Sequence, residues 1–412
     1  MAARYAGRSA ARTSRTIVDL VRSSGVVSRV ELAEMSGLTG ASISRTVKRL
    51  LDDGLLVETG QSDATGGKRR TLLELNTAGR FAIGVSIDDA RITYVLVNLG
   101  GEVVGEFSSE GIGASPPRAV VRRMAKEVRA VLSTGGVTSA AQVTGIGVAA
   151  PGRLDLRGTA MRSSREATEW EQFAIEPALQ EATGLPVTLE HDYVCAALGE
   201  FWVGRVPAAE DFVCFFAATG FGAGMVLGGE VYRGSSSNAG EIGHMVLDVG
   251  GTPCWCGSRG CLEAVAGPRA VVGRALERPG LAAALGLSGH PDRVRADFAA
   301  IAGAAAAGAA VTGGADCLDV VRDSARNVAA AVLSLTNVMD LDRVVLSGPA
   351  FAEAGAIYRD AVRDAVSGLS FLRQVHPVVV ELSQLGLQSA AIGAATVALD
   401  GGLIAPVSSP PR

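Results

Sequence analysis

The chain lacks the features that mark membrane and secreted proteins. No apolar run is long enough to span a bilayer, and the first residues, Met1 to Arg8, have no apolar core of a signal peptide. Its six cysteines do not suggest a disulfide framework, because three cluster between residues 254 and 261 and the others are scattered. We therefore expect a cytoplasmic protein with reduced thiols and no membrane partner.

Aromatic residues and lysine are also scarce. Aromatics make up 5% of the 412 residues, whereas hydrophobic residues make up 48%, enough to bury more than one core and to form two or three domains. Residues 1–80 hold 13 Lys plus Arg against 8 Asp plus Glu, a balance of +5, so the rest of the chain carries −9. The N-terminal part is therefore the one suited to an anionic polymer.

The N-terminal sequence has the pattern of a helix-turn-helix. Apolar residues recur at helical spacing from Arg12 to Ser23, and Ser28 is placed to cap a second short helix. A tight turn, residues 36–38, leads to the capping residue Thr39 and a third helix. The third helix has apolar residues on one face and basic residues on the other, as expected for a helix that enters a major groove.

Two predicted strands, residues 54–60 and 66–75, follow this helix and resemble the wing of a winged helix. Arg45 is the candidate for reading bases, with Ser42 and Ser44 as shorter hydrogen-bonding neighbours. The candidates for phosphate contact, which gives affinity rather than specificity, are Lys48, Arg49, Lys68, Arg69 and Arg70. The alternative is a three-helix module that binds protein instead of double-stranded DNA.

A histidine and three cysteines lie within eighteen residues of one another. His244, Cys254, Cys256 and Cys261, separated by several glycines, form a complete tetrahedral ligand set for a structural Zn²⁺ ion. The alternative is a group of reduced cysteines that only lies near a histidine. A closed four-ligand site needs neither Glu241 nor Glu263, so these carboxylates are free to accept hydrogen bonds from a polyhydroxyl ligand.

The segment from Gly240 to Glu263 resembles the zinc and sugar-binding signature of the ROK family, which contains bacterial sugar kinases and sugar-responsive repressors. The alternating strands and helices of residues 81–400 resemble the ribonuclease H-like, actin-type fold of that family. The expected fold class is α/β, an N-terminal winged helix-turn-helix followed by a two-lobed ROK domain. The expected domains are residues 1–79, a first lobe at 80–198 with a returning helix at 386–402, a second lobe at 199–385, and a disordered tail at 403–412.

The resemblance also bears on the choice between kinase and repressor. ROK kinases begin this domain with Asp-x-Gly-Gly-Thr, whereas the matching residues here are Ser86, Ile87, Asp88, Asp89 and Ala90. Serine replaces the acidic residue, and two carboxylates stand where backbone N–H groups should meet a polyphosphate. The later stretch from Leu346 to Pro349 also departs from the family's Gly-Gly-Gly turn. We therefore expect no enzymatic activity.

Most of the family's sugar site is kept. His191 and Asp192 resemble its Asn-Asp motif, with histidine in place of asparagine, although an aspartate at a strand end also serves as a cap. The resemblance assigns the effector pocket to Gly152, His191, Asp192, Glu241, His244 and Glu263.

We thus expect a homodimeric or homotetrameric repressor of carbohydrate genes that binds operator DNA and a sugar or sugar phosphate. The alternatives are an ATP-dependent sugar kinase with an N-terminal appendage, and a repressor controlled by a protein partner.

Overall fold

The computed structural model describes residues 2–61, 70–113, 115–137, 139–154, 161–162, 170, 173–204, 206–207 and 210–404. Lys68 and Arg69 lie outside the described residues, as does most of the expected C-terminal tail. None of the described helices is long and apolar enough to cross a membrane.

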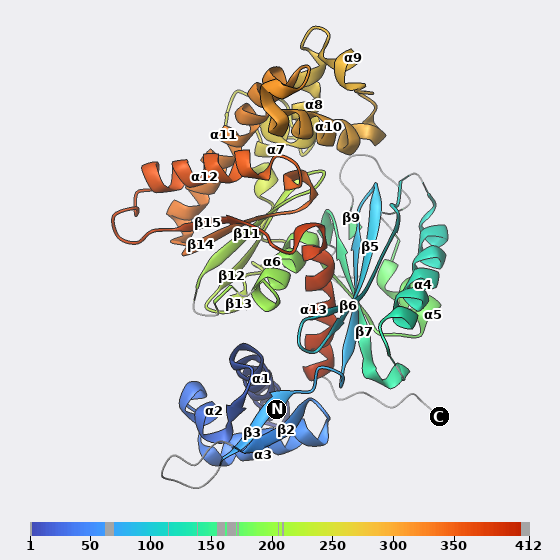
Figure 1. Cartoon of the computed structure of the whole chain (residues 1–412), viewed down its shortest axis with the longest axis vertical. Coiled ribbons are helices and arrows are strands. Elements are labelled where there is room, and N and C mark those ends of the chain that lie inside the picture. The colour runs from blue at the N-terminus through green and yellow to red at the C-terminus, as the bar shows by residue number, and fades with distance from the viewer. Residues whose placement is uncertain are drawn as a thin grey trace.

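The N-terminal unit, residues 2–75, follows the order of elements that the sequence predicts (Figure 1). Its elements are α1 (Ala2–Ser24), β1 (Val27–Ser28), α2 (Arg29–Ser36), α3 (Gly40–Asp52), β2 (Leu56–Gln61) and β3 (Thr71–Leu75), with the sheet order β1-β3-β2. Ser28 caps α2 in a capping box, since Glu31 N donates to Ser28 Oγ and Ser28 N donates to Glu31 Oε2. Thr39 caps α3 by accepting from Ser42 N. Both predicted caps are confirmed, but α1 begins well before the expected Arg12.

The first lobe is built on a mixed sheet with the order β10-β7-β4-β5-β6. Its elements are β4 (Phe81–Ile87), β5 (Arg91–Asn98), β6 (Val103–Glu110), α4 (Pro117–Thr134), β7 (Val143–Ala150), α5 (Ile175–Thr183) and β10 (Val187–His191), with a short ribbon of β8 (Arg153–Leu154) and β9 (Met161–Arg162). Helices α4 and α5 cover one face of this sheet. On the other face lies α13 (Ser389–Ile404), which confirms the expected returning helix and includes residues assigned to the tail.

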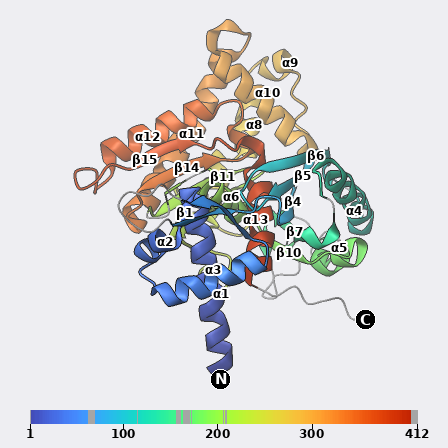
Figure 2. The ribbon, with the colours of Figure 1, turned by 60° about the horizontal axis from the view of Figure 1, so that its bottom comes forward.

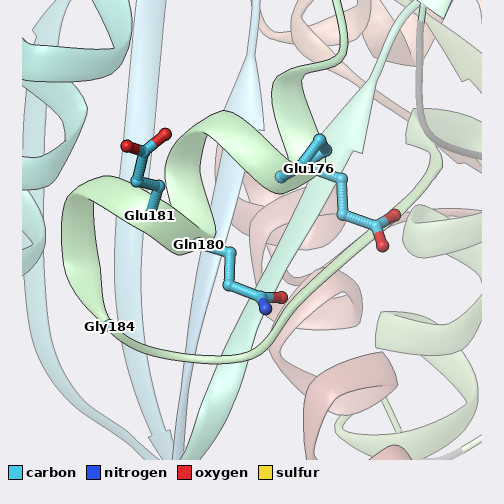
Figure 3. Close-up of a pocket in the computed structure, with 5 residues that line it drawn as sticks. Glu176, Gln180, Glu181 and Gly184 are labelled. Carbon is cyan, nitrogen blue, oxygen red and sulfur yellow. The ribbon is translucent and has the colours of Figure 1, made fainter.

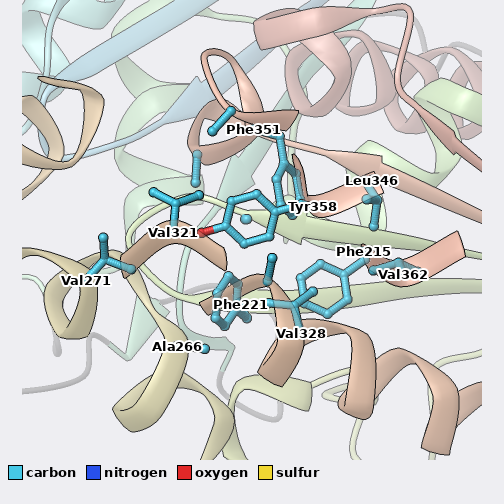
Figure 4. Close-up of a cluster of buried hydrophobic side chains, with 14 of the residues drawn as sticks. Phe215, Phe221, Ala266, Val271, Val321, Val328, Leu346, Phe351, Tyr358 and Val362 are labelled. Atoms are coloured by element: carbon cyan, nitrogen blue, oxygen red, sulfur yellow. The ribbon is translucent and has the colours of Figure 1, made fainter. Parts of the chain in front are cut away.

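The second lobe contains a sheet with the order β13-β12-β11-β14-β15. Its strands are β11 (Phe212–Ala217), β12 (Phe221–Leu227), β13 (Glu230–Val231), β14 (Arg343–Ser347) and β15 (Val379–Leu382). Its helices are α7 (Leu262–Ala266), α8 (Pro268–Leu276), α9 (Leu281–Leu285), α10 (Val294–Ala307), α11 (Gly314–Met339) and α12 (Gly355–Leu369). Figure 4 shows the core between sheet and helices, where the rings of Phe215, Phe221 and Tyr358 meet aliphatic side chains.

Helix α6 (Asp192–Trp202) links the two lobes. It packs on α13 and on strands β11 and β12, and the predicted lobe boundary after residue 198 falls inside it. Glycines permit this close packing, because a Cβ at Gly199 would overlap Ser389 O and one at Gly393 would overlap Cys195 O. Gly84 and Gly147 likewise bring β4 and β7 against the backbone of α13.

The N-terminal unit shares a hydrophobic core with the first lobe. One cluster joins Ile17 and Val18 of α1 and Val47 of α3 to Val97 of β5 and Leu399 of α13. In Figure 2 the first turns of α1 extend away from the body, and α1 also contacts α13. The N-terminal unit is therefore packed against the first lobe.

Candidate functional site

The predicted metal ligands come together in the second lobe. His244 ends a 3-10 turn (Ile242–His244), and the cysteines lie on the loop before α7. Their ligand atoms all lie within 4.8 Å of one another, with His244 Nδ1 3.6 Å from Cys254 Sγ and Cys256 Sγ 3.8 Å from Cys261 Sγ. The four side chains could hold one metal ion, and we call them the metal cluster.

Local backbone geometry holds this loop in shape. Gly257 and Gly260 have φ angles of 94° and 63°, which favour glycine, and a Cβ at Gly260 would overlap Asp248 O. Short bridges pair Val246 with Cys261 and Pro253 with Arg259. The glycines seen in the sequence therefore make the tight turns that bring the ligands together.

Trp255 connects the metal cluster to the adjacent carboxylate. Its Nε1 donates to Glu263 Oε1 over 2.8 Å, and its ring lies edge-on to His244 with centroids 4.9 Å apart. The other oxygen of Glu263 lies against Gly220, where a Cβ would overlap it. The sequence analysis missed Trp255, although its place between two predicted ligands was a usable signal.

Asp192 is the first residue of α6, and Glu241, which precedes the 3-10 turn of His244, lies beside Tyr193. Asp192 Oδ1 accepts from Tyr193 N over 2.8 Å, and Tyr193 Oη donates to Glu241 Oε1 over 3.4 Å. Burial raises the pKa of Asp192 to about 7, and the charges of Glu241 and Asp88 add to the shift. Burial beside the same carboxylates also raises the pKa of Tyr193. Asp192 therefore exchanges a proton near neutral pH, so it is equipped both to accept and to donate hydrogen bonds.

His191 links loops of the two lobes. The side chain is fully buried; Nδ1 lies 3.0 Å from Gly152 O and Nε2 lies 3.1 Å from Ser237 O, while the ring stacks on Tyr193. Ser237 has a φ of 61°, a conformation that costs a non-glycine residue free energy. These contacts place both ring nitrogens against backbone carbonyls of Gly152 and Ser237. The assignment of His191 and Gly152 to the effector pocket stays a prediction.

A small hollow lies between the lobes, beside Asp88 of the first lobe and Arg295 of the second. Arg295 of α10 donates to Asp88 Oδ1 over 2.5 Å, and Ala90 N donates to the same oxygen over 2.9 Å. The hollow lined by Ser86, Asp88, Asp192 and Arg295 has a volume of about 30 Å³, room for little more than one water molecule.

The predicted DNA-contacting residues have different surroundings. Ser44, Arg45 and Lys48 are exposed on α3, and the described residues offer Arg45 and Lys48 no ion pair. Ser42 is half-buried with its N–H bound to the cap of α3, and Arg70 is exposed before β3. Arg49 is exposed and donates to Ser14 Oγ on α1, and its phosphate contact stays a prediction.

A larger hollow, of about 640 Å³, lies on the outer surface at α5. Figure 3 shows that Glu176 and Gln180 project from one side of the helix and that Glu181 points away from them. Because no side chains converge there, we assign it no ligand.

The chain belongs to the ROK family, whose sequence model matches residues 82–400. The xylose repressor of Caldicellulosiruptor bescii is 25% identical over 383 residues, 92% of each protein. The DNA-binding transcriptional dual regulator NagC of Escherichia coli (strain K12) is 27% identical over 371 residues, 89% of this chain and 87% of NagC.

Solved structures extend the similarity over the N-terminal unit. A ROK family transcriptional regulator, a homolog of the E. coli MLC protein, has a TM-score of 0.71 at 25% identity and covers 96% of this chain and 97% of its own. A ROK family glucokinase from Streptomyces griseus has a TM-score of 0.63 at 27% identity and covers 78% of this chain and 100% of its own. The expected α/β fold with a two-lobed ROK domain is confirmed.

Proposed function

We propose that this protein is a sugar-responsive transcriptional repressor of carbohydrate uptake or catabolism genes, without kinase activity. The N-terminal unit, residues 1–79, binds operator DNA. A sugar or sugar phosphate binds between a first lobe, residues 80–198 with 386–402, and a second lobe, residues 199–385. The repressor names of relatives that match about nine-tenths of the chain support this function.

The proposed metal is a structural Zn²⁺ ion. Tetrahedral zinc, with Zn–S about 2.3 Å and Zn–N about 2.0 Å, places two thiolates about 3.8 Å apart and a thiolate and an imidazole about 3.6 Å apart. The separations of Cys256 Sγ from Cys261 Sγ and of His244 Nδ1 from Cys254 Sγ, 3.8 and 3.6 Å, fit these values. When bound, zinc would fix the loop that carries Trp255 and leave His244 Nε2 directed away from the metal.

The proposed effector pocket consists of Asp192, Glu241, His244 and Glu263. Carboxylates accept hydrogen bonds, and the hydroxyl groups of a sugar supply several donors. Tyr193 Oη donates to Glu241 and Trp255 Nε1 donates to Glu263, so both carboxylates are held in place beside the pocket.

The single observation that carries the choice between regulator and kinase is the ion pair of Asp88 with Arg295. The side chains come from opposite lobes, and Asp88 stands in the segment that matches the phosphate-binding motif of the family's kinases. A triphosphate would have to displace this ion pair and approach the carboxylates of Asp88 and Asp89. The cleft therefore disfavours ATP both by its volume and by its charge.

Arg45 and Lys48 on the exposed face of α3 are the proposed base and phosphate contacts, with Ser42, Ser44 and the wing residues Lys68, Arg69 and Arg70 beside them. A homodimer or homotetramer would place two such faces on a near-palindromic operator.

Phosphoryl transfer tests the absence of kinase activity. We expect no ADP above background when zinc-loaded protein is incubated with ATP, Mg²⁺ and D-xylose, N-acetylglucosamine or D-glucose in turn. In thermal unfolding, a binding sugar should raise the midpoint, whereas ATP should not, because only ligands of the folded state stabilise it. Sugar-dependent ADP release that Asp192→Asn eliminates would contradict the proposal and establish a kinase.

The hydrogen bond from Trp255 predicts a second effect. Trp255→Phe keeps an aromatic ring beside His244 but removes the N–H that donates to Glu263, so we expect the sugar to bind with about 1 kcal/mol less free energy, roughly fivefold weaker. Calorimetry measures the affinity, and elemental analysis should show unchanged zinc. Trp170→Phe, a buried tryptophan of the first lobe beside Phe173, is the matched control. Equal affinity in both variants would remove Trp255 from this role.

A further inference from the structure

Helix α6 runs from the effector pocket to the N-terminal unit. Its first residue is Asp192, and its last, Trp202, contacts Arg22 of α1. Eleven residues of helix span about 16 Å. A displacement at the first turn of such a short, buried helix reaches its last turn with little bending, since packed helices deform little.

The first turn of α6 is held by the second lobe. A Cβ at Gly222 or Gly240 would overlap the Tyr193 ring, and one at Gly224 would overlap Tyr193 O. Strand β12 and the loop before the metal cluster therefore lie directly on Tyr193. Any change in closure of the second lobe around a ligand must move these surfaces relative to α6.

Helix α13 packs closely on α6, and its C-terminal part contacts α1. The glycine contacts at Gly199 and Gly393 leave no space between the two helices. Near the other end of α13, Asp400 Oδ2 lies 3.0 Å from Arg15 Nη1. The two helices thus form one body that meets α1 at two places.

We call the meeting place the α1 contact; it consists of Arg15, Asp19, Arg22, Trp202 and Asp400. Arg22 Nη1 donates to Trp202 O, and the guanidinium carbon lies 4.4 Å from the centroid of the indole ring. Cation–π contacts of this kind are directional enough to depend on the relative placement of two helices.

Several buried polar atoms of the α1 contact are poorly satisfied. Within the described residues, no hydrogen-bond partner is present for Asp19 Oδ1, Arg22 Nε, Trp202 Nε1 or Asp400 Oδ1. Burial raises the pKa of Asp19 to about 6 despite the nearby arginines, which reflects the cost of a buried carboxylate. Unsatisfied buried groups lower the free energy needed to reach another arrangement that pairs them. The α1 contact is therefore suited to two alternative positions.

We propose that Arg22 and Trp202 are positioning residues that couple the effector pocket to the N-terminal unit, with α6 and α13 transmitting lobe closure to α1. This inference rests on the proposed function, because it names how the same pocket is regulated. Ligand binding changes the position of Tyr193 against β12. Helices α6 and α13 then shift together, and α1 and α3 reorient relative to the two lobes. Operator affinity then changes without any contact between sugar and DNA.

The test compares operator affinity with and without sugar in the full-length protein. The operator is a duplex selected from a random pool by the wild-type protein, and the sugars are D-xylose and N-acetylglucosamine. In wild type we expect sugar to change the operator Kd by about tenfold or more, within the usual range of allosteric coupling. In Arg22→Ala and in the milder Trp202→Phe, the Kd for sugar should stay within about threefold of wild type. The change in operator Kd caused by sugar, which measures the coupling, should fall below about threefold.

Arg326→Ala, which removes an exposed arginine of α11 paired with Asp323, is the matched control and should keep full coupling. Thermal unfolding shows whether Arg22→Ala is folded. If it is not, the result for Trp202→Phe tests the inference. Variants that are folded and bind sugar but keep the coupling of wild type would overturn the inference.

If neither sugar binds the wild-type protein, the proposal that a sugar is the effector fails. Hydrogen exchange then tests separately whether the start of α6 is coupled to α1. Asp192→Asn replaces the carboxyl group at the start of α6 with an amide, and it should change amide exchange in residues 15–24 by about threefold or more. Unchanged exchange in that segment would overturn the coupling independently of any sugar.

Discussion

Removal of zinc is expected to abolish the sugar response, and Cys261→Ser should have the same effect. Cys261 is fully buried, and loss of one ligand removes binding free energy that holds the loop from Cys254 to Cys261 in place. Trp255 then no longer fixes Glu263, and His244 loses its orientation. With two charge-assisted hydrogen bonds lost, sugar affinity should fall by roughly 3 kcal/mol or more, about 100-fold.

Three measurements on one preparation check this result: zinc by elemental analysis, sugar affinity by calorimetry, and indole emission. Cys317→Ser is the matched control, because Cys317 is an equally buried thiol outside the metal cluster. Zinc-free Cys261→Ser protein that binds sugar as tightly as wild type would contradict the structural role of the metal.

Arg45→Ala is expected to weaken operator binding by about 1–3 kcal/mol and to relax the sequence preference at one base pair, as for loss of a bidentate contact to a base. Lys48→Ala should instead weaken binding to all sequences and reduce the salt dependence, because a phosphate contact releases a counterion. Fluorescence anisotropy measures the affinity for the selected operator and for its single-base variants at several salt concentrations. The loss of base preference is then distinguished from the loss of salt dependence. An unchanged preference in Arg45→Ala would show that another residue reads the bases.

Local features of the fold were predictable because they depend on neighbouring residues. Ser28 with Glu31, Thr39 before α3 and the turns of the metal loop each involve groups a few residues apart. The sequence therefore predicted these elements and the clustering of the four metal ligands. Within residues 268–316, Val271, Phe298 and Ile301 pack into the core of the second lobe.

The remaining features depend on pairs far apart in the chain. Asp88 meets Arg295 across 207 positions, and Arg22 meets Trp202 across 180. Sequence patterns predict which face of an element is apolar but not which arginine will meet which carboxylate or ring. For the same reason the contacts of Arg49 with Ser14 and of His191 with two backbone carbonyls could not be anticipated.

The central claim is that a sugar bound between the lobes controls operator binding. The most direct measurement is titration of a preformed complex of zinc-loaded protein and labelled operator with D-xylose, N-acetylglucosamine, D-glucose and their phosphates, followed by anisotropy. The account predicts that at least one of them weakens the complex about tenfold or more, and that Asp192→Asn reduces this response. A complex unaffected by every one of these ligands at saturating concentration would contradict sugar control.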